Sequence, residues 1–329
     1  MPFATVVIGP AGVGKTTMAH ALQVHGEASK RAISVLNLDP AADNLPYRAD
    51  VDIRELITVE DAMTDMQFGP NGGLIYCMEY LVNHLDWLED KISEFGEEDT
   101  LIIDCPGQLE LYTHVPVMPR VLAALESWGV RLCVAYLMDA VAVHDPSKFI
   151  AGSLAGLAAM LQLPAPRLTV LSKADLVPSP EALEDFLDLE STVVFFERQQ
   201  QIDKKFFKRT PNFGYSKLQK AICRVIDDHA MLSFVPFSIK DDDAPAHVLS
   251  FSDHLTQYAE HAEIRIPEDE YDARNHHQAD DDHDFNDDND VQDDPYLADY
   301  QQSRKGRSLT EAAQAIFGPG VLGDGYDHL

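Results

Sequence analysis

The chain has 329 residues, enough for one large α/β domain or two smaller ones that bury a substantial core. Its 25 lysines and arginines stand against 55 aspartates and glutamates, a formal net charge of −30. We therefore expect no direct binding to nucleic acid or to an anionic membrane surface, which both need dense positive charge. The four cysteines lie far apart without CxxC spacing, which argues against a disulfide framework or a zinc site and favours a reducing compartment.

The start of the chain carries no targeting pattern. Met1-Pro2 leads directly into the apolar run 3–8, which is too short for a signal peptide and lacks its charged flank. The longest mostly apolar stretch, 151–163, has about 13 residues, whereas a membrane-spanning helix needs roughly 20. We therefore expect a cytoplasmic protein without a membrane-spanning segment.

Short runs that are apolar on both faces alternate with helix-length segments as far as residue 267. The expected strands are 4–8, 34–38, 101–104, 132–137, 168–171 and 234–237. The expected helices are 16–29, 74–91, 146–161, 180–189 and 217–229. Continuous hydrophobicity is typical of parallel strands that are covered on both sides. The sequence therefore predicts an α/β fold with a doubly wound, mostly parallel sheet.

The first expected strand leads into the pattern GxxxxGK[ST] of a phosphate-binding loop, followed by an amphipathic helix. The residues expected to bind the phosphates are Gly12, Val13, Gly14, Lys15, Thr16 and Thr17. Lys15 is expected to contact the β- and γ-phosphates, Thr16 to ligate Mg²⁺, and Thr17 to bond an α-phosphate. Pro10 occupies the place where one branch of these proteins carries a second lysine, so another polar group must complete the site.

Two later strands also end in polar residues that suit a guanine nucleotide. Asp104 and Gly107 have the DxxG spacing of a carboxylate that holds Mg²⁺ through water and an amide that contacts the γ-phosphate. The run Ser172-Lys173-Ala174-Asp175 resembles the [NT]KxD signature of guanine readers. The carboxylate of Asp175 would accept bonds from guanine N1 and N2, whereas adenine would present a lone pair to it. The sequence thus predicts GTP, with the stem of Lys173 on the base and Ser172 bracing the loop less well than asparagine or threonine.

Three phrases together resemble the GPN-loop GTPase family: LNLDPA over 36–41, FGPNGG over 68–73 and DCPGQLE over 104–110. The resemblance covers roughly residues 1–267. It implies a P-loop NTPase of the signal-recognition and MinD-like class that works as a dimer, with helices inserted around 192–220.

The resemblance also assigns residues to the hydrolysis step. It implies that a loop of Gly69, Pro70 and Asn71 enters the partner's active site, where Asn71 acts in trans to position the attacking water. It implies that Asp39, Gln108 and Glu110 hold and polarise that water. It also adds Asp39 to Thr16 and Asp104 as residues that hold Mg²⁺, with Asp39 and Asp104 acting through water. From the residues alone, 69–73 indicates an exposed turn, and an extended backbone would project Gln108 and Glu110 to one side.

By the same resemblance, the partner is a paralogous GPN-loop GTPase in a heterodimer. The implied role is the assembly and nuclear import of RNA polymerase II, whose subunits or assembly intermediates would be the clients, with shuttling to the nucleus. The segment 268–329 lies outside the resemblance. Its part 268–300 carries 14 acidic residues and one basic residue, so we expect a mostly disordered acidic tail, with a short helix over 309–317.

Two other functions remain open from the sequence. A P-loop kinase that phosphorylates a small molecule or an RNA end would share the phosphate loop, but the chain shows no arginine-rich lid. A scaffold that binds GTP with little turnover would keep every nucleotide motif, because turnover depends on what the partner contributes.

Overall fold

The computed structural model describes residues 2–177, 216–228 and 234–261, together with residues 183, 186–187, 192–194 and 197. The chain divides into two units, Met1–Glu263 and Ile264–Leu329. The expected tail over 268–329 and its helix over 309–317 lie outside the described residues, as does most of the expected insertion around 192–220. No helix in the described ranges is long and apolar enough to cross a membrane.

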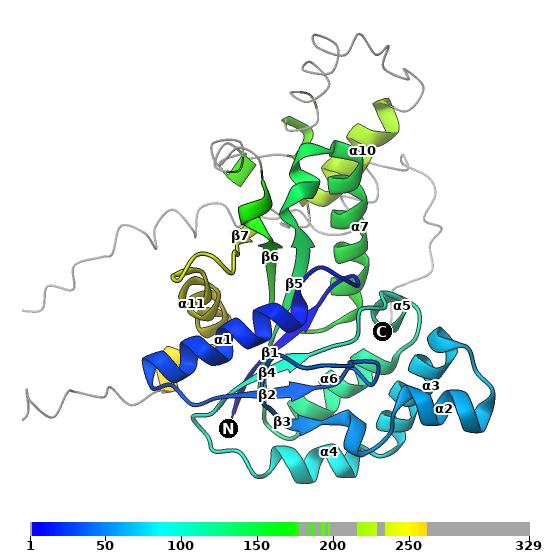
Figure 1. The fold of residues 1–329 in the computed structure, drawn as a ribbon. Helices are drawn as coiled ribbons and strands as arrows, with labels where there is room; N and C mark the ends of the chain where they lie inside the picture. Colours follow the sequence, from blue (N-terminus) through cyan, green and yellow to red (C-terminus); the bar gives the residue numbers. More distant parts are fainter. Residues whose placement is uncertain are drawn as a thin grey trace, which may run out of the picture. The chain divides into compact units, whose positions relative to one another are not determined.

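A parallel sheet of seven strands forms the centre of the first unit (Figure 1). Its strands are β1 (Phe3–Ile8), β2 (Ile33–Asn37), β3 (Ala49–Asp52), β4 (Thr100–Asp104), β5 (Arg131–Asp139), β6 (Arg167–Ser172) and β7 (Phe234–Pro236). The strand order is β3-β2-β4-β1-β5-β6-β7, and every neighbouring pair is parallel. The carboxyl ends of β1, β2 and β4 therefore meet at one edge, where the chain reverses its winding direction and ligands bind in such sheets.

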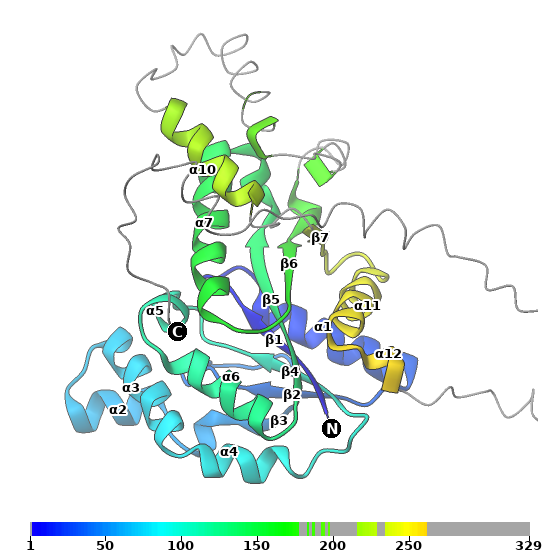
Figure 2. The same ribbon diagram turned by 180° about the vertical axis from the view of Figure 1, so that it is seen from behind.

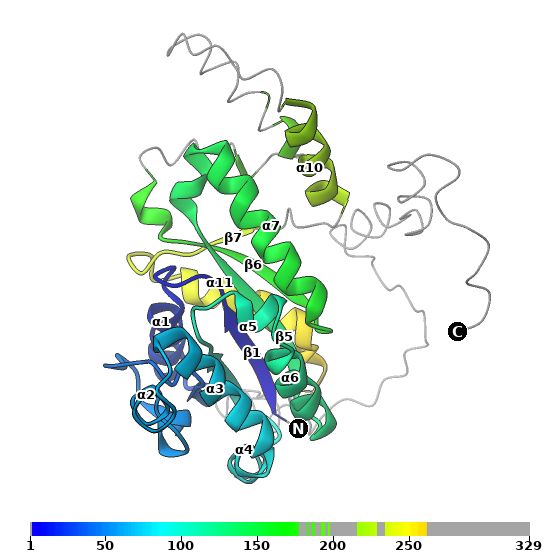
Figure 3. The ribbon, with the colours of Figure 1, turned by 90° about the vertical axis from the view of Figure 1, so that its right-hand side faces the viewer.

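Helices cover both faces of the sheet (Figures 1 and 2). Their bounds are α1 (Lys15–Ser29), α2 (Val59–Met66), α3 (Pro70–Asn83), α4 (Leu85–Ile92), α5 (Glu110–Thr113), α6 (Val117–Ser127), α7 (Pro146–Gln162), α10 (Ser216–Asp228), α11 (Ala244–Thr256) and α12 (Tyr258–His261). Helices α1 and α11 pack on one face through a core that includes Met18 and Val248. Helices α3, α4, α6 and α7 pack on the other, and Figure 3 shows α6 and α7 on the opposite side of β1 from α1. Val6 and Val7 belong to different cores because successive strand residues face opposite sides.

The fold confirms the predicted doubly wound parallel sheet, but one predicted helix is wrong. The single helix expected over 74–91 is two helices, because α3 ends at Asn83 and α4 begins at Leu85. His84 between them has a non-helical backbone, and its ring contacts the Tyr80 carbonyl at 2.8 Å through Nδ1. The chain can therefore change direction there without leaving that carbonyl unpaired.

The segment expected to be an exposed turn at 69–73 is also different. Pro70 is the first residue of α3 and Gly69 is its N-cap, so Asn71 lies in the first turn of a helix. Proline suits this position because its fixed φ is helical and its missing N–H has no helical partner there anyway. Gly73 lets α3 approach α2, since a Cβ at this residue would lie 3.2 Å from Met63 and 3.3 Å from Val59.

Candidate functional site

The phosphate loop connects β1 to α1, as the spacing predicted. Gly12 and Gly14 have φ values of 75° and 99°, in the left-handed region that favours glycine. The Lys15 ammonium donates to the carbonyl oxygens of Gly9 at 3.1 Å and Pro10 at 3.3 Å. Burial lowers the pKa of Lys15, while the neighbouring Asp104 carboxylate opposes that shift. The loop thus holds one nearly buried cation at the N-terminus of a helix, the arrangement that binds phosphate.

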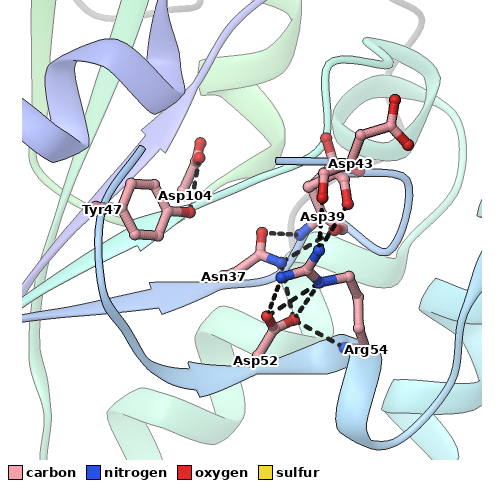
Figure 4. Close-up of polar contacts among 8 residues, drawn as sticks. Asn37, Asp39, Asp43, Tyr47, Asp52, Arg54 and Asp104 are labelled. Carbon is pink, nitrogen blue, oxygen red and sulfur yellow. Dashed lines mark hydrogen bonds and ion pairs between the residues drawn. The ribbon is translucent and has the colours of Figure 1, made fainter. Parts of the chain in front are cut away.

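Asp104 ends β4 and lies beside the loop. One carboxylate oxygen, Oδ2, accepts a hydrogen bond from the Tyr47 hydroxyl at 3.0 Å, whereas the other, Oδ1, is buried without a partner (Figure 4). Burial raises the pKa of Asp104, and the neighbouring Thr16 and Tyr47 hydroxyls oppose that rise. A buried unpartnered carboxylate oxygen close to a threonine hydroxyl is the donor set that Mg²⁺ prefers. The residues present therefore fit the predicted ion.

Asp39 follows β2 and lies near both charges. The Asn37 side chain accepts from the Asp39 amide at 3.0 Å, and Asp39 Oδ1 accepts from the Ala41 amide at 2.9 Å. Burial raises the pKa of the Asp39 carboxyl, while the Ala41 amide and the Lys15 ammonium oppose the rise. The structure thus brings Asp39, Lys15 and Asp104 together at the carboxyl edge of the sheet.

The residues expected to read guanine follow β6. The Ser172 hydroxyl donates to the carbonyl oxygen of Val13 at 2.7 Å and also lies 3.2 Å from that of Met138. The serine that replaces asparagine or threonine therefore still ties this loop to the phosphate loop. The Lys173 ammonium pairs with Asp139 at 2.9 Å, and its backbone has a φ of 57°.

The Asp175 carboxylate faces the loop that follows β7. Its Oδ2 lies 2.9 Å from the Lys240 ammonium, and this hydrogen bond holds the pKa of Asp175 below its usual value. The Asp175 side chain has an exposed fraction of 17%, compared with 70% for Lys240. The carboxylate is therefore ionised at neutral pH and ready to accept two hydrogen bonds from a base.

Gln108 and Asn71 lie in contact within one chain. The Gln108 side-chain amide donates from Nε2 to Asn71 Oδ1 at 2.7 Å, across 37 residues of sequence. Glu110 is exposed at the start of α5, and Leu109 before it has an αR backbone. The expected extended backbone from 108 to 110 is therefore wrong.

Thr16 is half-buried and Thr17 exposed in the first turn of α1.

Sequence reasoning missed the residues that support this site. They are Asn37, Tyr47, Asp52, Arg54 and, as the partner of Asp175, Lys240. Asn37 stands inside the phrase LNLDPA, which was the available signal. The others lie in loops, in the edge strand β3 and in the short helical turn after it, and none of the motifs found in the sequence includes them.

Comparisons with known proteins point to a family of nucleotide-binding proteins. A model of the family described as "Conserved hypothetical ATP binding protein" matches residues 7–258. The protein named "GPN-loop GTPase 3" from Mycosarcoma maydis is 40% identical over 279 residues, which cover 81% of this chain and 96% of that protein. The protein of the same name from Danio rerio is 41% identical over 272 residues, covering 81% and 92%.

A solved structure supports the fold. The GTPase in apo form from Pyrococcus abyssi superposes with a TM-score of 0.62 at 23% identity, covering 77% of this chain and 97% of that chain. At this identity the likeness supports the architecture alone, whereas the two relatives are similar in sequence over four fifths of the chain. With the phosphate loop, the DCPGQ and GPN phrases and the sheet order all in place, the chain belongs to the GPN-loop GTPase family.

Proposed function

We propose that this chain is a GTP-hydrolysing switch that works in a dimer with a paralogous GPN-loop GTPase. GTP is its substrate, and GDP and phosphate are its products. The observation that carries the proposal is the hydrogen bond from Ser172 to Val13, because it fixes the loop that bears Asp175 against the loop that binds phosphate. One rigid unit then reads the base and holds the phosphates of the same nucleotide.

In this proposal the amides of Gly12 to Gly14 and the Lys15 ammonium bind the β- and γ-phosphates. Thr16 and Asp104 would hold Mg²⁺, with Asp39 and Asp104 acting through water. When bound, the ion supplies charge neutralisation to the phosphate oxygens. Its support in this chain is the buried unpartnered Oδ1 of Asp104.

The hydrolysis step needs a positioned water more than a strong base. The bond between the γ-phosphorus and the bridging oxygen breaks, and a bond from the γ-phosphorus to the water oxygen forms. The bridging oxygen leaves with GDP, one water proton stays on the inorganic phosphate, and the other leaves to solvent. Gln108 orients the water through its amide, with Asp39 and Glu110 as the neighbouring carboxylates. In the dimer proposal Asn71 acts on the partner's site in trans.

Guanine specificity provides the direct test of this site. We expect Asp175→Asn to lower GTP turnover at least tenfold and to gain turnover of xanthosine triphosphate, because the asparagine amide can donate to the extra carbonyl of xanthine. Phosphate release measured with each nucleotide checks this. Asp242→Asn, an exposed aspartate nearby, is the matched control and should keep the preference for GTP. An unchanged GTP preference in Asp175→Asn would contradict the proposal.

The same assay separates hydrolysis from the two alternatives. Phosphate release from GTP without any acceptor supports the hydrolase, whereas dependence on an acceptor alcohol would identify a kinase. Binding with no turnover, even with the paralogous partner present, would identify a scaffold. The described part of the chain offers no specific observation in favour of either alternative.

The proposed cellular role is the assembly and nuclear import of RNA polymerase II, which rests on the family resemblance. The experiment is affinity purification of the tagged chain with GDP and with a non-hydrolysable GTP analogue, followed by mass spectrometry. Recovery of RNA polymerase II subunits and a paralogous GPN-loop GTPase, with a difference between the two nucleotides, supports the role. Absence of both classes under both conditions would contradict it.

A further inference from the structure

We propose that Asn37, Asp52 and Arg54 form a clamp that positions Asp39 for GTP hydrolysis. The inference rests on the proposed role of Asp39 and assigns the three residues a positioning task rather than contact with the nucleotide. Figure 4 shows the cluster, in which side chains from β2, β3 and the turn after β3 converge on the loop 39–43.

Asn37 holds the first residue of this loop. Its Oδ1 accepts from the Asp39 amide at 3.0 Å, and its Nδ2 donates to the Asp39 carbonyl at 3.2 Å and to Asp52 Oδ1 at 2.9 Å. The Asn37 residue is fully buried. One amide side chain therefore fixes both backbone polar groups of Asp39, which restricts where its carboxylate can point.

Arg54 holds the far end of the same loop. Its Nη1 donates to the carbonyl oxygens of Ala42 at 2.9 Å and Asp43 at 3.1 Å. Its Nε and Nη2 donate to the Asp52 carboxylate at 3.0 and 2.5 Å. The planar guanidinium thus uses one edge for a carboxylate and another for two loop carbonyls, an arrangement that a lysine ammonium cannot reproduce.

Asp52 connects the two halves of the clamp. It accepts from Asn37 and from Arg54, and its Oδ1 also accepts from the Arg54 backbone amide at 3.0 Å. Although burial alone would raise the pKa of Asp52, the bonds from Arg54 and Asn37 hold it below its usual value. The carboxylate is therefore charged at neutral pH and keeps both partners in place.

Several of these hydrogen bonds end on the backbone of the loop that carries Asp39. The cluster therefore positions Asp39 and does more than stabilise the fold. Arg54 donates to the carbonyls of Ala42 and Asp43, 12 and 11 positions earlier in the chain, at the far end of the loop that begins with Asp39. The loop between the two holding points contains Pro40 and the turn in which Asp39 accepts from Ala41. Both ends of a short stiff segment are thus fixed, and the carboxylate near Lys15 sits at its start.

The test compares Arg54→Lys with Arg48→Lys. Arg54→Lys keeps the charge and loses the fork, so we expect kcat for GTP to fall about tenfold while KM changes less than about threefold. Arg48 has an exposed fraction of 87% and its Nε lies 3.8 Å from the Asp50 carboxylate, so Arg48→Lys should leave both parameters unchanged. An unchanged kcat in Arg54→Lys, or a fall in KM and kcat that also appears in Arg48→Lys, would overturn the clamp.

The double variant shows whether Arg54 acts through Asp39. Asp39→Asn alone should lower kcat, and adding it to Arg54→Lys should cost less than it costs in the original chain, because the residues act as a unit. Multiplicative effects would overturn the clamp. If Asp39→Asn alone leaves kcat unchanged, the proposed role of Asp39 fails, a result separate from failure of the clamp.

A second variant covers loss of folding. If the melting temperature of Arg54→Lys lies below the assay temperature, Asp52→Glu takes its place, since it keeps both charges and moves the carboxylate by one methylene. The same fall in kcat with retained KM is expected. An unchanged kcat in a folded Asp52→Glu protein would overturn the clamp.

Discussion

At the scale of single residues, Tyr47 shows how a site depends on groups outside its motifs. Its hydroxyl donates to Asp104 Oδ2 and is itself buried. Burial raises the pKa of the Tyr47 phenol far above its usual value, so the group is a permanent donor at neutral pH. With Oδ2 occupied, the unpartnered Oδ1 is left as the oxygen available for Mg²⁺.

We expect Tyr47→Phe to weaken Mg²⁺ binding about tenfold, because the carboxylate loses the donor that fixes its orientation. The measurement is a Mg²⁺ titration of fluorescent GTP-analogue binding, which does not depend on turnover. Hydrolysis at saturating Mg²⁺ should recover most of its original rate. Tyr80→Phe on α3, where the ring stacks on His84, is the control and should bind Mg²⁺ normally. An unchanged titration in Tyr47→Phe would show that Asp104 needs no such support.

The clamp and the Tyr47 contact also show why sequence reasoning found only part of the site. The phosphate loop and Asp104 could be predicted because phosphate and metal chemistry demand fixed residue types at fixed positions on strands. Lys240 and Asp175, in contrast, are 65 positions apart and meet only because β6 and β7 are neighbours. Their contact depends on the tertiary path, which no local spacing specifies.

At the scale of elements, the buried strands could be predicted and the edge strand could not. The expected strands agree with β1, β2 and β4–β7 within two residues, because apolar runs covered on both faces have a strong pattern. Strand β3 has the sequence ADVD, and its two aspartates interrupt the apolar run by which the other strands were predicted. Both make polar contacts, since Asp50 accepts from the Val35 amide at 3.2 Å and Asp52 belongs to the clamp.

Helix α2 was not predicted, although the sequence before it contains an N-cap pattern that marks the start of a helix. The Thr58 hydroxyl oxygen accepts from the Asp61 amide at 3.2 Å, the N-cap arrangement expected of threonine three residues before an acidic side chain. The helix is only eight residues long, so its apolar repeat is too brief to stand out. The prediction for the GPN segment was wrong for a different reason. Its glycines favour a turn, whereas Pro70 favours the first turn of a helix.

Helix α7 approaches the sheet at two glycines, for which we expect alanine substitutions of different cost. A Cβ on Gly156 would lie 2.5 Å from the ring of buried Tyr136, whereas one on Gly152 would meet the flexible Met138 sulfur at 2.8 Å. We expect Gly156→Ala to lower the free energy of unfolding by about 1–3 kcal/mol, because overpacking exceeds the gain in helix propensity. Gly152→Ala, the matched control, should change it by less than about 1 kcal/mol. Denaturant unfolding measures both, and equal effects would contradict this packing.

At the scale of the whole molecule, the proposed dimer raises the question of which chain supplies Asn71 to each active site. The proposal gives Asn71 to the partner's site, yet the side chain lies 2.7 Å from Gln108 of its own chain. An amide pair of this kind is exposed and uncharged, so a partner's loop can replace it at small cost in free energy. The contact is therefore compatible with a monomer in which the side-chain amides of Asn71 and Gln108 bond each other, and with a dimer in which that bond is broken.

The experiment uses a complex with the paralogous partner in which one P-loop is disabled at a time. It shows whether Asn71 acts on the partner's site or on the site of its own chain. With Lys15→Ala in this chain, only the partner's site turns over, and we expect Asn71→Ala to lower that turnover about tenfold, because the water there loses a positioning group. With the partner's P-loop lysine replaced instead, only this chain's site is active, and Asn71→Ala should leave phosphate release unchanged. The reverse pattern, with loss at this chain's own site alone, would mean that Asn71 acts through its own Gln108 and would refute the trans arrangement.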